Sequence, residues 1–270
     1  MTADLDTLLT ALYVFVGDHV VPPETRRPGR PKRVTDAELM CLAVAEVLLG
    51  FPSQAHWPRL CYCRLGGMFG YLPKQPGYCK RLNNAAALMD KAMHMLAAEL
   101  SAETDEYRLL DATAIPCGTS RPTAQRSRLA GWANYGYRAS HSRWYWGLKL
   151  YLITTAHGMP VVWWLADPTL GEREVARKLL GHAHDHALPP APLVLIARQR
   201  LRWSGLRTPS RASWASGSCA PTGATSPTAT PTPAGVYARI TQRLLALAAA
   251  IWHNCNTAVP TARSLIAYDH

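Results

Sequence analysis

The chain has 270 residues, of which 48% are hydrophobic, so it can bury one medium core with a smaller one, and a mainly disordered protein is excluded. Its net charge of +11 and pI of about 9.6 favour a polyanionic partner, because Lys and Arg that neutralise phosphates release condensed counterions. No apolar run reaches the roughly 18 residues of a membrane span, and Asp4 and Asp6 stand where a signal peptide would be basic. We therefore expect a cytoplasmic chain with reduced thiols, with nucleic acid as its leading partner and no membrane partner.

Apolar residues at helical spacing mark the first hundred residues as a helical region. An amphipathic helix is expected over residues 5–13. A second is expected over residues 36–49, because Thr35 and Glu38 form a capping-box pattern before its apolar stripe. A longer helix over residues 78–100 carries its methionines on one face, which indicates core packing.

A basic connector that is rich in proline joins the first two helices. Its prolines keep it extended, and arginine-rich arms of this kind can lie in a narrow minor groove of DNA. The alternative is a basic loop that only faces water. The candidate DNA-binding residues of this connector are Arg26, Arg27, Arg30, Lys32 and Arg33.

From Tyr107 the pattern changes to that of a mixed sheet. A short apolar run around Asp111 is followed by expected strands over residues 147–155, 159–166 and 193–197. An Asp within a buried strand is costly to ionise unless something pairs with it. A divalent metal ion is one solution for Asp111, and a hydrogen bond to the backbone or to Arg is the other.

Between the first two expected strands lies a segment without acids in which arginines alternate with aromatic residues. Arginine can bind phosphate while aromatic rings stack on bases. We favour DNA contact for the arginines, and we expect Trp144 and Trp146 to be core because they lie beside the following strand. The arginines are Arg121, Arg126, Arg128, Arg138 and Arg143.

Four segments, taken as a set, resemble a bacterial insertion-sequence transposase of the DDE class. They are Leu109-Leu110-Asp111-Ala112-Thr113, Leu129-Ala130-Gly131-Trp132-Ala133-Asn134-Tyr135-Gly136-Tyr137, Gly147-Leu148-Lys149-Leu150-Tyr151 and Ile251-Trp252-His253-Asn254. The similarity covers most of residues 1–197 and resumes near Thr232.

The resemblance implies an α/β (α+β) fold in which a helical DNA-binding region precedes an RNase H-like mixed sheet. In that family three carboxylates hold Mg²⁺ or Mn²⁺ ions for end cleavage and strand transfer. Asp111 matches the first carboxylate and is the implied catalytic and metal-binding residue, and Lys149 joins the DNA-binding set. The implied partner is double-stranded DNA carrying element terminal repeats, in association with the nucleoid, and a homodimer is left open.

The second and third carboxylates of the family pattern are missing. The second should follow Ala197, where the chain instead reads Arg198-Gln199-Arg200, and the third should be a helical Glu in a later segment. No Asp or Glu occurs between Asp185 and Asp269, a gap of 83 residues. Asp167, Glu172 and Glu174 could in principle replace the lost carboxylates, but their default interpretation is that of surface acids.

The segment after the fourth expected strand is low in complexity. Of residues 201–235, 27 of 35 are Ser, Thr, Pro, Ala or Gly, a composition that cannot bury enough apolar surface to order itself. We interpret it as the product of two compensating frameshifts, one just after Ala197 and one shortly before Pro233. Codons for Asp-Lys-Gly-Tyr-Ala-Gly, preceded by one extra C, can read as Arg198 to Trp203. The alternative is a genuine linker in a diverged protein.

These observations predict four regions: residues 1–104 as the helical DNA-binding region, 105–197 as a partial RNase H-like core, 198–235 as a disordered segment that disrupts the fold, and 236–270 as the C-terminal helix of the core. The predicted function is that of a DDE transposase homologue without catalytic activity. The alternatives are a DNA-binding protein that represses or titrates related elements, and a misfolded remnant.

Overall fold

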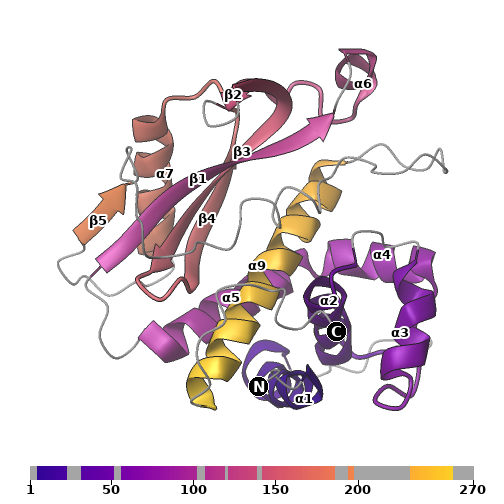
Figure 1. Ribbon diagram of the computed structural model, residues 1–270. Helices are drawn as coiled ribbons and strands as arrows, with labels where there is room; N and C mark the ends of the chain where they lie inside the picture. The colour runs from indigo at the N-terminus through magenta and orange to yellow at the C-terminus, as the bar shows by residue number, and fades with distance from the viewer. Residues whose placement is uncertain are drawn as a thin grey trace. The chain divides into compact units, whose positions relative to one another are not determined.

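The computed structural model describes residues 5–22, 32–51, 56–101, 107–118, 121–138, 142–185, 194–197 and 232–257. The chain divides into two compact units, Met1–Leu100 with Tyr237–His270 and Ser101–Val236. The first is helical and the second is built on a sheet (Figure 1). The predicted connector residues Arg26, Arg27 and Arg30 and the low-complexity residues 198–231 lie outside the described residues.

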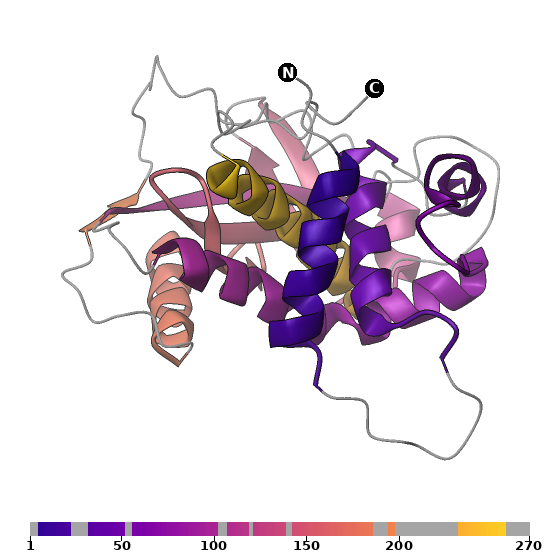
Figure 2. The same ribbon diagram turned by 90° about the horizontal axis from the view of Figure 1, so that it is seen from below.

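The helical unit contains α1 (Leu5–Phe15), η1 (Val16–Val20), α2 (Asp36–Leu48), α3 (Trp57–Leu65), α4 (Gln75–Asn84), α5 (Ala86–Ser101) and α9 (Pro233–Asn256). Helices α1 and α2 lie side by side (Figure 2), where the Cys41 thiol donates a hydrogen bond to the Leu9 carbonyl. The expected capping box is present: the Thr35 side chain accepts from the Glu38 amide, and the Glu38 carboxylate accepts from the Thr35 amide. Met89 and Met93 are buried, as the helical pattern predicted.

Two features of this unit differ from the sequence expectations. The long helix expected over residues 78–100 is broken at Ala85, which leaves helical geometry and separates α4 from α5. Helix α9, expected in the catalytic core, makes its described contacts with the N-terminal helices, for example from Gln242 to the carbonyl of Ala43 in α2. The N-terminal and C-terminal segments therefore fold together.

The second unit contains β1 (Tyr107–Gly118), α6 (Arg121–Arg126), β2 (Asn134–Arg138), β3 (Arg143–Thr155), β4 (Pro160–Ala166), α7 (Glu172–Asp185) and β5 (Val194–Ala197). The strand order is β2-β3-β1-β5, and β4 also pairs with β3. The pairs β1–β3, β2–β3 and β3–β4 are antiparallel, whereas β5 is parallel to β1. The expected fold class is confirmed, because a helical region precedes a mixed sheet.

Helix α7 covers one face of this sheet. Val175 and Leu179 of α7 pack on Tyr151, Ile153, Val162 and Ala166, and Leu110 and Ala112 of β1 lie against the same cluster (Figure 1). The two faces of the sheet therefore carry different residues, because successive side chains of a strand point to opposite faces.

Among the described residues, no helix combines the length and the apolar character needed to cross a membrane. The described cysteines are free thiols, as expected: Cys41, Cys61, Cys63, Cys79, Cys117 and Cys255.

Candidate functional site

Asp111 lies in β1 on the sheet face opposite α7. Its neighbours Leu110 and Ala112 pack against the α7 cluster, so strand alternation turns Asp111 the other way. Its cross-strand partner is Leu152 of β3, and the Asp111 side chain is exposed. The expectation that Asp111 is buried within its strand is therefore wrong, and solvent can stabilise the carboxylate without a metal or an Arg partner.

The parallel register of β1 and β5 ends one residue short of Asp111. Leu109 pairs with Ile196 and Leu110 with Ala197. The described pairing stops at this point. Arg198 follows Ala197 in the sequence, and its structure lies outside the described residues.

Asp167, the first candidate substitute, caps the turn that follows β4. Its carboxylate accepts hydrogen bonds from the Thr169 amide and hydroxyl at 2.8 and 2.7 Å, and from the Asn134 amide at 3.3 Å. Burial raises the pKa of Asp167, but these hydrogen bonds outweigh burial and hold the pKa below its usual value. These bonds give Asp167 a local structural role.

The other two candidates, Glu172 and Glu174, are both bonded to lysines. Glu172 accepts from Lys149 at 2.6 Å and Glu174 from Lys178 at 2.9 Å. Lys149 is three residues from Leu152 on β3, so the two side chains lie on opposite faces of the sheet. Lys149 therefore belongs to the face that α7 covers. The Lys149–Glu172 pair is therefore separated from Asp111 by the sheet. In the described part of the chain, no group of three or more His, Cys, Asp or Glu side chains could hold a metal ion.

The β2–β3 hairpin exposes a row of aromatic rings. Tyr137 lies opposite Trp144 and Tyr135 opposite Trp146, so these four side chains share one face of the hairpin. Trp146 is buried, whereas Tyr135, Tyr137 and Trp144 are 47%, 52% and 69% exposed. The core interpretation is confirmed for Trp146 and wrong for Trp144, because β3 extends past its pairing with β1 into a two-stranded ribbon with β2.

The predicted DNA-binding cations of this unit differ in their surroundings. Arg126, Arg128 and Arg143 are exposed. Arg138 donates to the Ala114 carbonyl at 3.2 Å and lies 5.9 Å from the centre of the Tyr145 ring. The side chain of Arg121, in α6, lies outside the described residues.

Lys149 has a structural partner in Glu172. Burial lowers the pKa of Lys149, but the hydrogen bond and charge of Glu172 together with the contribution of Tyr151 outweigh burial and raise the pKa above its usual value. Lys149 therefore stays charged and bonded to the protein, which disfavours it as a phosphate contact relative to the exposed arginines.

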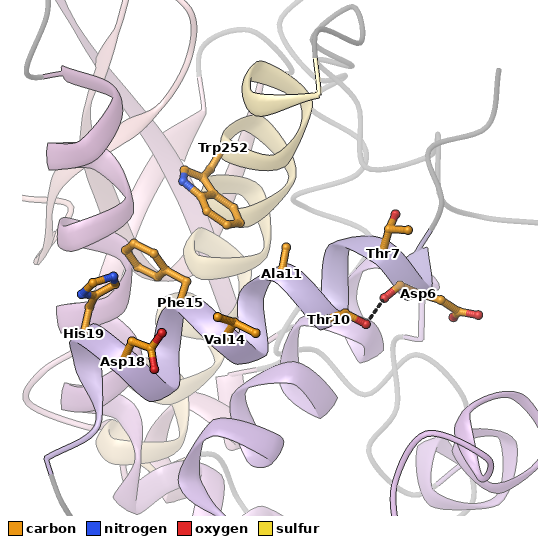
Figure 3. Close-up of a pocket in the computed structure, with 9 residues that line it drawn as sticks. All are labelled: Asp6, Thr7, Thr10, Ala11, Val14, Phe15, Asp18, His19 and Trp252. Carbon is orange, nitrogen blue, oxygen red and sulfur yellow. Dashed lines mark hydrogen bonds between the residues drawn. The ribbon is translucent and has the colours of Figure 1, made fainter.

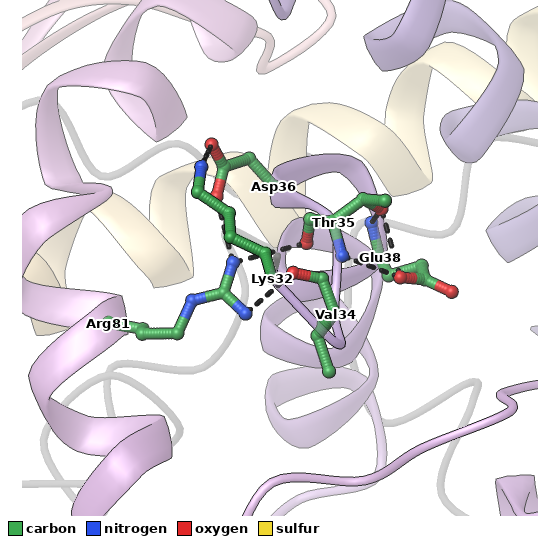
Figure 4. A network of polar contacts seen from close by, with 6 residues as sticks. All are labelled: Lys32, Val34, Thr35, Asp36, Glu38 and Arg81. Carbon is green, nitrogen blue, oxygen red and sulfur yellow. Dashed lines mark hydrogen bonds and ion pairs between the residues drawn. The ribbon is translucent and has the colours of Figure 1, made fainter. Parts of the chain in front are cut away.

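The two described connector cations belong to a network at the start of α2 (Figure 4). Lys32 donates to the Asp36 carboxylate at 2.6 Å, and Arg81 of α4 donates to the same carboxylate at 2.8 Å and to the Val34 carbonyl at 2.7 Å. Arg33 lies over the Tyr71 ring at 3.9 Å. Lys32 and Arg33 thus contribute to the helical unit, and the DNA contact proposed for the connector stays a prediction.

An open groove of about 660 Å³ runs along α1 toward Trp252 of α9 (Figure 3). Its apolar lining includes Val14, Phe15 and Trp252, and its polar lining includes Asp6, Asp18 and His19. No described feature of this groove indicates a catalytic arrangement.

The chain matches no protein-family model, no curated protein and no solved structure. Its function is therefore inferred from its residues and their geometry. Sequence patterns had indicated Asp111, the arginines and the aromatic residues between them, including Tyr135 and Tyr137, with core packing as the alternative for the rings. The register adds that Tyr135 and Tyr137 share one exposed face, as the alternation of Tyr135, Gly136 and Tyr137 is typical of a strand.

Proposed function

We propose that this chain is a homologue of the DDE insertion-sequence transposases that has lost DNA cleavage and retains DNA binding. Its partner would be double-stranded DNA that carries the terminal repeats of an element. It would act in the cytoplasm, in association with the nucleoid.

The β1–β5 register is the observation that carries this proposal. It pairs Ala197, the end of β5, with Leu110, the residue before Asp111, and the resemblance implies a second carboxylate directly after Ala197. The family pattern has Asp at that position and this chain has Arg198. A cationic side chain in place of a metal ligand supports loss of the catalytic step.

The described carboxylates do not suit the pair of Mg²⁺ or Mn²⁺ ions that the family uses. Asp111 lies on one face of the sheet, and Lys149 with its partner Glu172 belongs to the other. Divalent ions of this kind prefer several oxygen ligands at one place. Because Asp111 is the only described carboxylate assigned to its face, we derive no cleavage step through a metal ion.

The direct test incubates the purified full chain with DNA that carries its own element ends, in magnesium or manganese. We expect cleavage no greater than that of an Asp111→Asn variant, while both proteins bind the DNA equally well. Cleavage that depends on Asp111 would show that acids outside the described residues complete the site.

A second candidate function is repression or titration of related elements by DNA binding. It is favoured by the absence of any acid from Ala112 to Ala166, a stretch that includes the exposed arginines. Two results together would support this function. One is a gel shift of terminal-repeat DNA that weakens steeply with salt, and the other is repression of the element's promoter in cells that contain the chain. A gel shift without any effect on expression would favour the first candidate.

The history of the chain can be tested from its gene. If codons 190–240 in another frame encode an Asp after Ala197 and a helical Glu before Pro233, the frameshift hypothesis stands. If no frame does, the segment is a genuine linker and the repressor function becomes the leading proposal. Rapid proteolysis within residues 1–180 would instead indicate a misfolded remnant.

A further inference from the structure

The aromatic face of the β2–β3 hairpin has no role in the chemistry of Asp111, yet it is the largest group of exposed rings in the described sheet unit. Tyr135, Tyr137 and Trp144 lie on one face, and the rings of Tyr137 and Trp144 are 5.2 Å apart at an interplanar angle of 53°. Exposed aromatic residues gathered in one place commonly mark an interaction site.

The reverse face of the hairpin is fixed to the protein. Arg138 bonds to the Ala114 carbonyl of β1, and Tyr145 packs so closely against Gly136 that a Cβ there would lie 2.7 Å from its ring. The same Cβ would lie 2.6 Å from the side chain of Pro168. The hairpin is therefore anchored from behind, which fixes the strand positions that carry the exposed rings.

The charge around the hairpin selects the kind of ligand. Arg126 and Arg128 are exposed in the segment before the hairpin, and no acid occurs from Ala112 to Ala166. Arg143 is also exposed, but it lies opposite Arg138 on the reverse face of the hairpin. A nucleic acid offers both phosphates for the guanidinium groups and flat bases for the rings. In a duplex the base faces are covered by neighbouring base pairs, so stacking on Tyr and Trp requires unpaired bases.

We propose that Tyr135, Tyr137 and Trp144 form a stacking platform for the unpaired bases of a single DNA strand. This inference rests on the proposed DNA-binding function and adds a second ligand, single-stranded DNA, to the duplex. Trp144 and Leu152 lie on the same face of β3, because they are eight residues apart. Leu152 is the cross-strand partner of Asp111, and eight residues span about 26 Å along the strand. The platform is thus a subsite distinct from the position of Asp111.

The test measures affinity of the full chain for a fluorescent oligothymidylate and for a duplex of the same length. Stacking contributes roughly 1–3 kcal/mol per base, so we expect Trp144→Ala to weaken oligothymidylate binding by about 5- to 150-fold. Duplex affinity should change by less than about 2-fold. Trp144→Phe, which keeps a ring, should retain most of the single-strand affinity.

Two further variants separate stacking from charge and from folding. Arg128→Gln should lower the salt dependence of single-strand binding by about 0.7 in the log–log slope, whereas Trp144→Ala should leave the slope unchanged. Trp164→Ala is the matched control, because Trp164 is 37% exposed and lies opposite Tyr151, on the α7 face. It should bind both DNAs as the unaltered chain does.

The remaining outcomes each overturn the inference in a distinguishable way. If Trp144→Ala binds oligothymidylate normally while the duplex still binds, the platform is wrong and the proposed function stands. If Trp144→Ala loses both ligands equally, the face is a duplex surface. If it changes only the oligomeric state in light scattering, the face is an interface between copies. If the unaltered chain binds neither DNA, the proposed function fails as well.

Discussion

The helical unit and the β2–β3 hairpin use their charged and aromatic residues in opposite ways. In the helical unit the buried Glu46 of α2 accepts hydrogen bonds from Tyr78 at 2.7 Å, Arg239 at 2.8 Å and Gln242 at 2.9 Å. In the hairpin Tyr137 and Trp144 are more than half exposed.

The contrast separates residues that build the fold from residues that can bind a ligand. Glu46 is fully buried, and burial together with the Glu46 charge raises the pKa of Tyr78 well above its usual value, so the phenol stays protonated and donates. These groups form hydrogen bonds with one another and so join α2, α4 and α9. Substitutions in this cluster should therefore change stability, and substitutions in the hairpin should change binding.

Glu46→Ala is expected to have the largest effect on stability. It removes the carboxylate that accepts from the Arg239 guanidinium, the Tyr78 hydroxyl and the Gln242 amide, and removal of one partner from a buried ion pair costs about 3–5 kcal/mol. The free energy of unfolding should fall by that amount in urea titrations followed by circular dichroism.

Trp144→Ala is the matched comparison for Glu46→Ala. Its side chain is 69% exposed, so the free energy of unfolding should change by less than about 0.5 kcal/mol. The distinction between the two regions would be wrong if Glu46→Ala lowered the free energy of unfolding by less than about 1 kcal/mol. It would also be wrong if Trp144→Ala lowered it by as much as Glu46→Ala does.

Gly136→Ala should affect both stability and binding, because it lies where the hairpin is anchored. The added Cβ would meet Pro168 and Tyr145 at 2.6 and 2.7 Å, and overpacking of this kind costs about 1–3 kcal/mol. The shifted hairpin should also bind oligothymidylate more weakly. Gly181→Ala is the control, since a Cβ there meets nothing within 4 Å and Ala favours the helix interior of α7. Equal stability of the two variants would contradict the close packing at Gly136.

Local signals predicted the helical elements well. The capping box at Thr35 and the apolar stripe behind it specify α2 within the segment itself, so its start at Asp36 was expected correctly. The break at Ala85 was missed because neither Gly nor Pro marks it. Helix α7 was also missed, because only a narrow stripe with Val175 and Leu179 is buried.

Long-range pairing explains what the sequence could not predict. The contact of Gln242 with Glu46 joins residues 196 positions apart, so the placement of α9 with the N-terminal helices has no local signal. The exposure of Trp144 likewise depends on β3 reaching beyond β1. Asp111 was identifiable because an acid interrupts an apolar run, but its exposed environment and its face of the sheet follow only from the register.

Asp36→Asn should destabilise the protein less than Glu46→Ala or Gly136→Ala, and its effect should depend on pH. Burial raises the pKa of Asp36, but the hydrogen bonds from Lys32 and Arg81 outweigh burial and lower the pKa below 3.8. A carboxyl group with a lowered folded-state pKa stabilises the protein fully above its unfolded-state pKa, and this contribution is lost as pH falls through the folded-state value.

At pH 7 the Asp36→Asn substitution should therefore lower the free energy of unfolding by up to about 1 kcal/mol. In urea titrations at successive pH values, the difference from the unaltered chain should stay constant down to about pH 4 and shrink below it. A difference that does not vary with pH would mean that the Asp36 charge contributes nothing, and that the network at the start of α2 is held by the Arg81 contacts with the backbone.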